Sequence, residues 1–552
     1  MESFINDNLT EITAIINKIS NLKKRDPDKT AKIIGSSRIS GVEHLTKPLL
    51  LYIFNRLNES GEIHLEKNAE TIFLENIKSK NIRTISGVTP VTIMTKPYPC
   101  PGKCIYCPNE KDMPKSYLAK EPGAQRALAN NFNPYRQTFN RLKAYSINGH
   151  PTDKVEIIII GGTWSFYKRS YQRWFIYEIF RALNNFNNSG NRKINNDEIE
   201  KIISFKDLEK IFKINETAKA RCVGLSIETR PDFIDYHEAV NLRKLGVTKV
   251  QLGVQSLNEK VLKIVKRGHT VEDTKKAFKL LRSFGFKIQI HWMPNLPGSD
   301  PKHDLIDFNK LFTLKYYKPD EIKIYPCSLI GGTELEKLFN RRKWKPYSQR
   351  QLTQLLTKCL ISTPRYCRVS RVIRDISSED IISGNRKSNL RQDAEHNLKG
   401  QNIVEIRYRE MKNSEVRRSE LGLKITSYNT STGKDIFLEI VDVYDRIAGF
   451  LRLSCPKIVK IDNGDRLFPI ELMDSSLIRE VHVYGVSVPI GTLKNDAFQH
   501  LGLGKFLIKI SEELSLKQGF RKISVISAVG TKGYYKNLGF LDGGLYQFKK
   551  LA

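Results

Sequence analysis

Cys100-Pro-Gly-Lys-Cys104-Ile-Tyr-Cys107 is the stretch that decides the fold of this 552-residue chain. Its three cysteines are separated first by three residues and then by two, in a loop that also contains proline and glycine. Three thiolates leave a tetrahedral zinc site one ligand short, but they can hold three irons of a [4Fe–4S] cluster and leave the fourth iron open. Thiols that are close only by chance are the other alternative, and the spacing favours the cluster.

The length and composition indicate a folded protein of roughly three or four domains at ~150 residues each. No apolar run approaches the ~18 residues of a membrane-spanning helix, so no membrane partner is expected. The first residues include Glu2, Asp7 and Glu11 and lack the apolar stretch of a secretory signal. Eight cysteines in so long a chain do not form a secreted disulfide framework. We therefore expect a cytoplasmic protein with reduced thiols.

The charge balance indicates a polyanionic partner. Lysine and arginine total 91 against 59 acidic residues, which gives a net charge of +32. Such an excess attracts nucleic acid, although a genomic bias is the alternative, and the Asn-rich residues 184–196 agree with it. Basic residues gather, however, at residues 341–345 and 365–374. Nothing resembles a DNA-reading helix-turn-helix or zinc finger, so RNA is predicted and DNA is not.

Residues 1–80 are predicted to form a small helical region. Ile5, Leu9, Ile12 and Ile16 recur at helical spacing, and a second apolar helix is expected at residues 49–57. Its basic residues are Lys23, Lys24, Arg25, Lys29 and Lys32. We expect this basic region to bind RNA, with a solvated helix surface as the alternative.

Strands and helices alternate in residues 81–360. Strands are expected at residues 155–160, 222–227, 249–254, 286–291 and 321–325, and helices at 171–183, 232–245 and 271–284. Such repeated units predict a parallel sheet, either a barrel or a doubly wound sheet. In a barrel, the residues after each strand meet at one rim. Those positions hold Gly161, Gly162, Thr163, Glu228, Arg230, Gln255, Ser256, His291 and Pro326, and these groups suit a nucleoside-like ligand.

After a basic, loop-rich linker at residues 361–415, a second α/β domain is expected at residues 416–552. The segment Gln499-His-Leu-Gly502-Leu-Gly504-Lys505 opens a predicted helix, whose backbone N–H groups suit a pyrophosphate. A Rossmann fingerprint has a different order and glycine spacing. The segment is similar to the acetyl-CoA loop of GNAT acetyltransferases, and Tyr534 and Tyr535 follow at the position of a proton donor to the CoA thiolate. An aromatic core pair is the alternative for these tyrosines.

The whole pattern resembles one known family. The cysteine loop, with Tyr106 before its last cysteine, resembles that of radical S-adenosylmethionine (SAM) enzymes. Together with the GNAT-like part it resembles the catalytic subunit of Elongator and its single-chain archaeal and bacterial relatives. Further matching motifs are Ile227-Glu-Thr-Arg-Pro-Asp232, Met293-Pro-Asn-Leu-Pro-Gly298 and Ser388-Asn-Leu-Arg-Gln392. The resemblance implies an α/β fold: a partial (β/α) radical SAM barrel, a C-terminal GNAT domain and a helical N-terminal region.

The resemblance also implies an activity, a tRNA carboxymethyluridine synthase acting on uridine 34 with a [4Fe–4S] cluster, SAM and acetyl-CoA. A 5′-deoxyadenosyl radical would take a hydrogen from the acetyl methyl, the carbon radical would add to C5 of uridine, and thioester hydrolysis would release CoA. tRNA is the implied substrate, bound partly by residues 1–80, and other Elongator-type subunits are candidate partners. The alternative is a protein lysine acetyltransferase with a structural iron–sulfur cluster.

The resemblance assigns site residues one by one. The cluster ligands would be Cys100, Cys104 and Cys107, and the catalytic residues Tyr535, Tyr534 and Lys154. Acetyl-CoA would be bound by Lys154, Glu480, Val481, His482, Val483, Gln499, Gly502, Leu503, Gly504, Lys505 and Tyr535. Gly161, Gly162, Thr163, Glu228 and Arg230 would contact the nucleoside part of a cofactor. Residues 400–410 lack the cysteines that many relatives carry there, so we predict no zinc at that segment.

Overall fold

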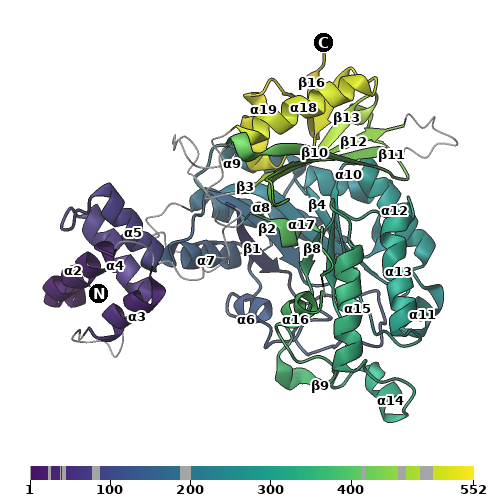
Figure 1. Ribbon diagram of the computed structural model, residues 1–552, viewed down its shortest axis with the longest axis horizontal. Helices are drawn as coiled ribbons and strands as arrows, with labels where there is room; N and C mark the ends of the chain where they lie inside the picture. Colours follow the sequence, from purple (N-terminus) through teal and green to yellow (C-terminus); the bar gives the residue numbers. More distant parts are fainter. Residues whose placement is uncertain are drawn as a thin grey trace.

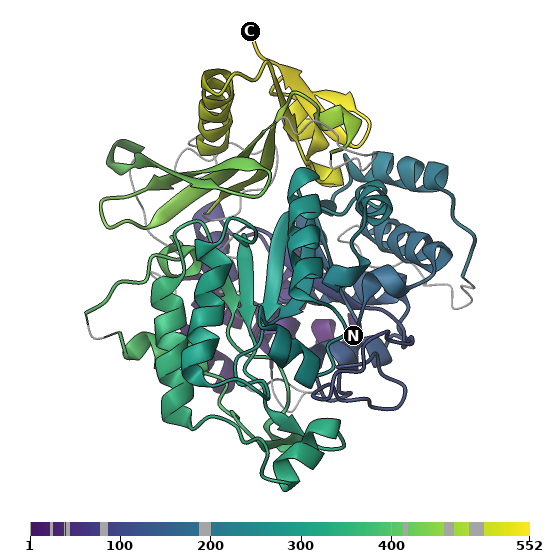
Figure 2. The same cartoon turned by 90° about the vertical axis from the view of Figure 1, so that its right-hand side faces the viewer.

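The computed structural model describes residues 2–22, 26–37, 39, 45–77, 87–186, 200–398, 400–411, 418–457, 468–484 and 502–552. Three parts are visible in Figure 1: a helical N-terminal unit, a central parallel sheet with helices around it, and a C-terminal sheet with its own helices. The turned view in Figure 2 shows the C-terminal sheet seated across one end of the central part.

The N-terminal unit is helical, as predicted. Its helices are α1 (Glu2–Asp7), α2 (Leu9–Ser20), α3 (Pro27–Gly35), α4 (Lys47–Glu59) and α5 (Lys67–Ile77). The helical spacing of Ile12, Ile16 and Ile19 places all three on the buried face of α2, and these residues belong to a separate hydrophobic core. The predicted basic residues 23–25 lie outside the described part of the chain.

The central sheet is a partial parallel barrel, which confirms the predicted fold class. Its seven strands follow the order β1-β2-β3-β4-β5-β6-β8, and every neighbouring pair is parallel. The strands are β1 (Thr89–Met94), β2 (Lys154–Ile160), β3 (Arg221–Thr229), β4 (Lys249–Gln255), β5 (Lys287–Trp292), β6 (Glu321–Ile324) and β8 (Arg368–Arg371).

Helices cover the outer face of the barrel. The helices of this part are α6 (Pro122–Leu128), α7 (Pro134–Ile147), α8 (Arg169–Asn185), α9 (Phe205–Asn215), α10 (Tyr236–Lys244), α11 (Glu259–Ile264), α12 (Val271–Ser283), α13 (Pro301–Thr313), α14 (Glu334–Asn340), α15 (Gln349–Ser362), α16 (Leu390–His396) and α17 (Ile406–Arg409). A two-stranded sheet of β7 (Leu329–Ile330) and β9 (Ile381–Ser383) lies beyond the barrel. None of the helices in the described ranges has the length and apolarity needed to span a membrane.

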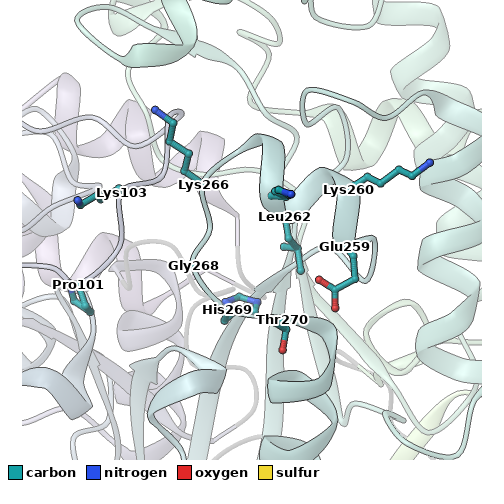
Figure 3. Close-up of a pocket in the computed structure, with 10 residues that line it drawn as sticks. Pro101, Lys103, Glu259, Lys260, Leu262, Lys266, Gly268, His269 and Thr270 are labelled. Atoms are coloured by element: carbon teal, nitrogen blue, oxygen red, sulfur yellow. The ribbon is translucent and has the colours of Figure 1, made fainter.

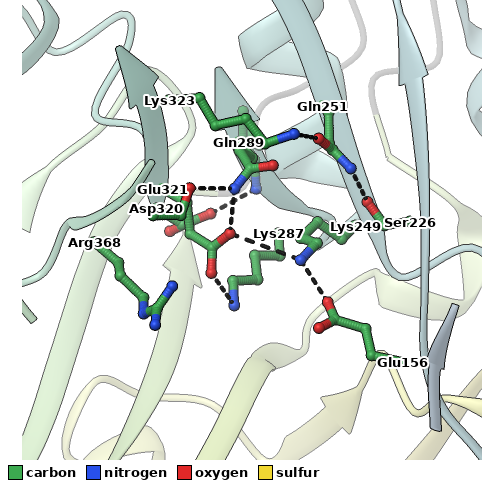
Figure 4. Close-up of polar contacts among 12 residues, drawn as sticks. Glu156, Ser226, Lys249, Gln251, Lys287, Gln289, Asp320, Glu321, Lys323 and Arg368 are labelled. Atoms are coloured by element: carbon green, nitrogen blue, oxygen red, sulfur yellow. Dashed lines mark hydrogen bonds and ion pairs between the residues drawn. The ribbon is translucent and has the colours of Figure 1, made fainter. Parts of the chain in front are cut away.

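The inner face of the barrel is polar. Val250 and Leu252 of β4 are fully buried in the core that the helices share, whereas Lys249 and Gln251 alternate with them and face inward (Figure 4). Gln251 donates a hydrogen bond to Ser226 Oγ at 2.7 Å on the neighbouring strand. The barrel interior is therefore closed by hydrogen-bonded side chains rather than by an aliphatic core.

Residues 361–415, expected to be a basic linker, contribute to the barrel. β8 pairs with β6 in parallel, with Ile322 opposite the fully buried Val369. The segment also holds α16 and α17, and Arg391 of α16 donates a hydrogen bond to Val369 O at 2.7 Å. Charged residues that suggested a linker flank the one apolar residue that β8 buries. Their charge alone therefore did not reveal that this segment belongs to the barrel.

The C-terminal domain is a mixed sheet in the order β10-β11-β12-β13-β14-β16-β15. Its elements are β10 (Gly422–Asn429), β11 (Gly433–Val441), β12 (Ile447–Pro456), β13 (Ser476–Val483), α18 (Leu503–Lys517), β14 (Lys522–Val525), α19 (Lys532–Lys536), β15 (Leu541–Gly543) and β16 (Tyr546–Lys550). β13 and β14 are parallel and pair only from Ser476 to Ile478. The second half of β13 thus diverges from β14, and its backbone does not pair with β14 along that edge.

Candidate active site

The three-cysteine loop lies at the carboxyl end of the barrel, after β1. Cys104 is buried, and Cys100 and Cys107 are half-buried. The loop is held from two sides, since Ile105 N–H donates to Val265 O at 3.2 Å and Ile105 O accepts from Leu335 N–H at 2.8 Å. These backbone bonds fix the loop without using the thiols.

Gly102 is the residue that lets this loop fold tightly. A Cβ at this position would lie 3.6 Å from both the Cys100 and Cys104 sulfurs and only 2.5 Å from Nη1 of Arg230. The sequence predicts Arg230 at the rim after β3. The structure shows its guanidinium directly beside the cysteine loop. A side chain larger than hydrogen would have to displace it.

Arg267 makes the environment of the loop cationic. It is buried, donates from Nη2 to Gly253 O at 2.6 Å and points Nη1 at Cys104 Sγ at 3.5 Å. A hydrogen bond with Cys107 and the charge of Arg267 lower the pKa of Cys104 to about 4, although burial opposes both. A low thiol pKa favours the thiolate, which is the form that binds iron.

The loop fits a cluster better than a single ion. In the described ranges, no three His, Cys, Asp or Glu side chains converge as a single metal ion requires. A [4Fe–4S] cluster places each thiolate on a different iron, so such convergence is not needed. Two buried polar atoms near the loop, Arg230 Nη1 and Gln255 Oε1, have no hydrogen-bond partner among the described residues. Buried atoms of this kind are usually satisfied, so the site suits a polar ligand.

The glycines after β2 have different surroundings. Gly161 and Gly162 both have positive φ, +121° and +102°. A Cβ on Gly161 would lie 2.2 Å from Thr95 Oγ1, whereas a Cβ on Gly162 would meet nothing within 4 Å. Thr163 is buried behind them. Gly161 is thus needed for packing between β1 and β2, and Gly162 is the glycine whose backbone a ligand can approach.

Glu228 lies in a group of polar side chains at the inner rim. Its carboxylate accepts a hydrogen bond from Tyr117 OH at 2.8 Å and faces Lys323 Nζ at 3.5 Å. His291 Nε2 lies 3.8 Å from the same carboxylate. Burial, together with Lys323 and three arginines, holds the pKa of His291 well below its usual range, so the imidazole is neutral. The rim therefore offers one carboxylate, one ammonium and one neutral imidazole to a ligand.

The C-terminal domain covers the opposite, amino end of the barrel. Arg479 of β13 pairs with Asp320, which precedes β6, and donates to Phe286 O, which precedes β5, at 2.9 Å. Arg452 of β12 donates to Tyr366 O, near the start of β8, at 2.5 Å. Burial alone would raise the pKa of Asp320, but the guanidinium groups of Arg479, Arg452 and Arg282 lower it to about 2. The joint is a dry, ionised network.

Glu480 connects this joint to the barrel interior. Its carboxylate accepts from Arg452 Nε at 2.7 Å and pairs with Lys287 at the start of β5. Lys287 also reaches Glu321 Oε1 at 2.7 Å, and Glu321 accepts from Gln289 at 2.6 Å, as Figure 4 shows. The segment predicted to bind acetyl-CoA therefore continues directly into the polar side chains of the barrel.

Lys154 also lies at this end, as the first residue of β2. It is in register with Arg221 of β3, and a Cβ on Gly530 of the C-terminal domain would lie 2.6 Å from the Cβ of Arg221. Gly530 is in the 3-10 turn η8 (Val529–Thr531), which precedes α19 and its two tyrosines. Burial lowers the pKa of the Lys154 ammonium, and the Arg221 charge adds to this while Asp153 opposes it. Lys154 is thus beside the turn that positions Tyr534 and Tyr535.

The first turn of α18 lies near those tyrosines. Gly502 caps α18 in the left-handed conformation with φ +70°, and no side chain of the described residues caps the helix, so its first N–H groups suit an anion. A Cβ on Gly504 would lie 2.8 Å from Tyr534 OH. Tyr535 is buried against Phe540 with ring centroids 5.6 Å apart. Gln499 lies outside the described residues.

Comparisons with known proteins agree with this geometry. Residues 98–308 match the Radical SAM superfamily, and residues 319–399 match the Radical_SAM C-terminal domain. A tRNA uridine(34) acetyltransferase of Methanocaldococcus infernus is 39% identical over 498 residues, which are 87% of this chain and 89% of the relative. Elongator complex protein 3 of Schizosaccharomyces pombe is 34% identical over 501 residues, 87% of each. The chain belongs to the Elongator complex protein 3 family.

A solved structure extends this relation to the fold. The archaeal Elp3 of Methanocaldococcus infernus, with an N-terminal deletion of residues 1–46, matches with a TM-score of 0.69 and 36% identity. The match covers 85% of this chain and 100% of that one. As a member of the radical SAM superfamily, this Elongator complex protein 3 relative is an enzyme whose barrel suits SAM and a [4Fe–4S] cluster.

In this family member, the predicted site residues fall into two groups at opposite ends of one barrel. The carboxyl end holds Cys100, Cys104, Cys107, Gly161, Gly162, Thr163, Glu228 and Arg230. The amino end holds Lys154, Glu480, Val481, His482, Val483, Gly502, Leu503, Gly504, Lys505, Tyr534 and Tyr535. The structure brings the members of each group together and keeps the two groups apart by the length of the barrel strands.

Three residues at the carboxyl end were missed by the motif search. Arg267 faces Cys104, Tyr117 donates to Glu228, and Lys323 lies between Glu228 and Gln251. Lys323 could have been found, because polar residues alternate with aliphatic ones along β4, β5 and β6, and this marks a polar inner face. Arg267 belongs to a segment, Arg267-Gly-His269, that matches the family, but this match assigned it no role, and Tyr117 carries no local signal. Only the tertiary fold brings both to the carboxyl end.

Proposed function

We propose that this chain converts uridine 34 of tRNA to 5-carboxymethyluridine with acetyl-CoA as the carbon donor. The printed names of the relatives, tRNA uridine(34) acetyltransferase, support the substrate. The observation that carries the proposal is the buried joint between the C-terminal domain and the amino end of the barrel. It attaches the domain that would hold acetyl-CoA to the same barrel that holds the cysteine loop, which supports a shared reaction.

The residues of the carboxyl end would hold the radical-forming groups. Cys100, Cys104 and Cys107 would bind the cluster, and Glu228 and Arg230 would hold SAM at the inner rim. When bound, the cluster and SAM supply a carbon-centred radical that can take a hydrogen atom from a methyl group. The cationic surroundings of Arg267 and Arg230 would keep the anionic cluster in place, since opposite charges in a buried site attract strongly.

The residues of the amino end would hold acetyl-CoA. The unpaired edge of β13 from residue 480 to 483 offers backbone groups to the pantetheine arm, and residues 502–505 offer N–H groups to the pyrophosphate. Lys154 would contact the same ligand from the barrel. Tyr535 and Tyr534 would protonate the CoA thiolate, and the hydroxyl of Tyr534 beside Gly504 suits this role.

The domains would divide this work. Residues 1–80 would bind tRNA, residues 81–360 would carry the radical chemistry, residues 361–415 would complete the barrel and connect it onward, and residues 416–552 would hold acetyl-CoA. The N-terminal unit supports an independent binding role because its hydrophobic core is separate from that of the barrel.

The competing activity is acetylation of protein lysines. It requires that an acceptor lysine reach the acetyl group from solvent and that the C-terminal domain work without the barrel. Apolar residues of that domain, among them Phe437, Phe450 and Leu477, belong to the hydrophobic core of the barrel. Removal of residues 1–360 would expose them, so we expect the isolated C-terminal part to be destabilised and inactive, although it keeps a core of its own.

The test uses full-length protein reconstituted without oxygen and incubated with tRNA, acetyl-CoA, SAM and a reductant. Nucleosides are then analysed by mass spectrometry, with reactions lacking acetyl-CoA or SAM as controls. We expect 5-carboxymethyluridine only in the complete reaction. If the cluster is intact and unmodified tRNA is bound, but no product forms, the proposal is wrong. Acetylation of a protein by a chain lacking residues 1–360 would support the competing activity instead.

A further inference from the structure

A pocket of about 660 Å³ lies beside the cysteine loop, on a face that the predicted site residues do not use. One wall is the loop itself, and the other is α11 with the segment that follows it, as Figure 3 shows. The lining residues are Pro101, Lys103, Glu259, Lys260, Leu262, Lys263, Lys266, Gly268, His269 and Thr270. We call this pocket the lysine groove.

The lysine groove is strongly cationic. Lys103, Lys260, Lys263 and Lys266 are exposed along it. In the described ranges, an ion pair is found for Lys266, with Glu334, and for none of the other three. The one carboxylate of the lining, Glu259, accepts a hydrogen bond from Val271 N–H at 2.7 Å. The groove therefore holds an excess of positive charge that nothing in the described chain neutralises.

The floor of the lysine groove contains a buried histidine. His269 is 4% exposed, and neither of its ring nitrogens makes a hydrogen bond of normal geometry to a described residue. Burial, with the charges of Arg267 and Arg230, lowers its pKa to about 2, so one nitrogen carries a hydrogen and the ring is neutral. One ring nitrogen interacts with the backbone carbonyl of Val254, so in the neutral ring the other nitrogen is left as an acceptor for a hydroxyl of a ligand in the groove.

We propose that the lysine groove binds the phosphate groups of the RNA strand that carries the target base. This inference rests on the proposed function and names the surface by which its substrate is held. Lys260 and Lys263 are three residues apart on α11 and so lie on the same face of this short helix, which lines the groove across from Lys103 of the cysteine loop. An RNA strand between them would lie against the loop, with its bases close to the barrel rim.

A protein that delivers electrons to the cluster is the other anionic partner that could bind here. Protein interfaces have an apolar, well-packed centre and bury roughly 800 Å² on each side. The apolar side chains in the lining are only those of Pro101 and Leu262, which are too few for such a centre. The described lining thus suits a narrow, flexible polyanion better than a globular partner.

The test compares two triple variants of the full-length, reconstituted protein. The groove variant is Lys103→Ala, Lys260→Ala and Lys263→Ala. The control variant is Lys201→Ala, Lys206→Ala and Lys210→Ala, on and before α9, which contacts η8 near the amino end of the barrel. Both remove the same charge. Affinity for tRNA is measured at several salt concentrations, and iron content and circular dichroism check that both variants fold.

The expected result is a change in the salt dependence of binding. Each contact to a single-stranded phosphate contributes about 0.7 to the magnitude of the slope of log affinity against log salt concentration. The slope of the groove variant should therefore be smaller in magnitude by about 2. The control variant should keep the slope of the unaltered protein. SAM cleavage with dithionite should be unchanged in both, because a small reductant does not need the groove.

Three outcomes would overturn the inference, and they can be told apart. Equal slopes for the groove variant and the unaltered protein, in an enzyme that modifies tRNA, would reject the groove and leave the proposed function intact. Slower electron transfer from reduced flavodoxin with unchanged tRNA binding would assign the groove to a redox partner. Absence of tRNA binding by the unaltered protein would reject both proposals. A reduced slope without any modified nucleoside would support the groove and reject the proposed function alone.

Discussion

The two ends of the barrel differ in whether buried ion pairs join them to the C-terminal domain. At the amino end, Asp320 pairs with Arg479, and Glu480 pairs with Arg452 and Lys287, all within the chain. Both ends also hold buried polar atoms without a partner in the described ranges, such as Arg230 Nη1 at the carboxyl end and Arg479 Nε at the amino end. Buried ion pairs that cross two domains are typical of a permanent joint, and none of the ion pairs in the described ranges joins the C-terminal domain to the cysteine loop.

This difference implies that changes at the two ends should have different consequences. Substitutions at the carboxyl end should abolish the reaction and leave the free energy of unfolding nearly unchanged. At the amino end they should lower stability first and affect chemistry through the position of the C-terminal domain. Each prediction below tests that distinction.

The largest effect is expected for Cys104→Ala. Loss of one of three thiolates should abolish the cluster and all uridine modification, while affinity for acetyl-CoA stays within about twofold, because that site lies at the other end. Iron content, visible absorption and nucleoside mass spectrometry measure the result. Cys222→Ala is the matched control, since this buried thiol lies near the start of β3 and should leave the cluster intact. Modification that persists in Cys104→Ala would remove the cluster from the proposed reaction.

The next effect is expected for Asp320→Asn at the amino end. It leaves the buried guanidinium of Arg479 with Asp435 as its remaining carboxylate partner in the described ranges, and removing one partner from such a buried network costs up to about 3–5 kcal/mol. The free energy of unfolding in denaturant measures the loss. The control Glu513→Gln, on the exposed face of α18, should change it by less than ~0.5 kcal/mol.

The pH dependence of stability follows from the same carboxylate. The folded state holds the pKa of Asp320 at about 2, below the ordinary 3.8, so its contribution is present above pH ~4 and is lost as pH falls toward 2. The contribution is on the order of 2 kcal/mol. The difference between the unaltered protein and Asp320→Asn should therefore shrink over this window. A difference that is constant from pH 5 to pH 2 would contradict the ionised joint.

The sequence predicted the barrel better than it predicted the joint. The strands at residues 155–160, 222–227 and 249–254 were found within two residues of β2, β3 and β4, because short segments with several Val, Ile or Leu residues, bounded by polar residues, mark buried strands. β1 and β8 were missed. β1 contains Pro90, which disfavours a strand, and β8 is four residues long with arginine at both ends.

The ion pairs of the joint had no signal in the sequence. Asp320 and Arg479 are 159 residues apart, and charge alone does not tell a buried pair from two solvated side chains. The cysteine loop was predictable because its ligands lie within eight consecutive residues. Sites built from one segment can be read from motifs, whereas sites built across domains need the fold.

A smaller effect is expected for Glu228→Gln at the carboxyl end. The amide keeps the shape of the side chain but removes the charge that Tyr117 and Lys323 face. Hydrogen bonds to charged groups contribute about 1.5–3 kcal/mol, so affinity for SAM should fall about 10- to 150-fold. Calorimetry on the reconstituted protein measures it. The free energy of unfolding and the affinity for acetyl-CoA should not change, and a parallel fall in all three quantities would mean that Glu228 acts in the structure rather than at a ligand.

The smallest effect, and the one that best separates packing from chemistry, is expected at two glycines three residues apart. A Cβ on Gly530 would lie 2.6 Å from the Cβ of Arg221 and 2.9 Å from Cys222 O, so Gly530→Ala should push the C-terminal domain away from β3 and cost about 1–3 kcal/mol. A Cβ on Gly533 in α19 would meet nothing within 4 Å, so Gly533→Ala should stabilise the helix by about 0.5–1 kcal/mol.

Changes of opposite sign in the free energy of unfolding for these two variants would localise the joint to η8. Both glycines lie on the same turn-and-helix segment before the tyrosines. Gly530→Ala should also weaken acetyl-CoA binding, because Lys154 and the η8 turn would no longer lie side by side. The cluster content and the affinity for SAM should stay unchanged. If both variants are stabilising, the C-terminal domain does not depend on this contact, and the distinction between a permanent amino-end joint and a ligand-accepting carboxyl end would no longer hold.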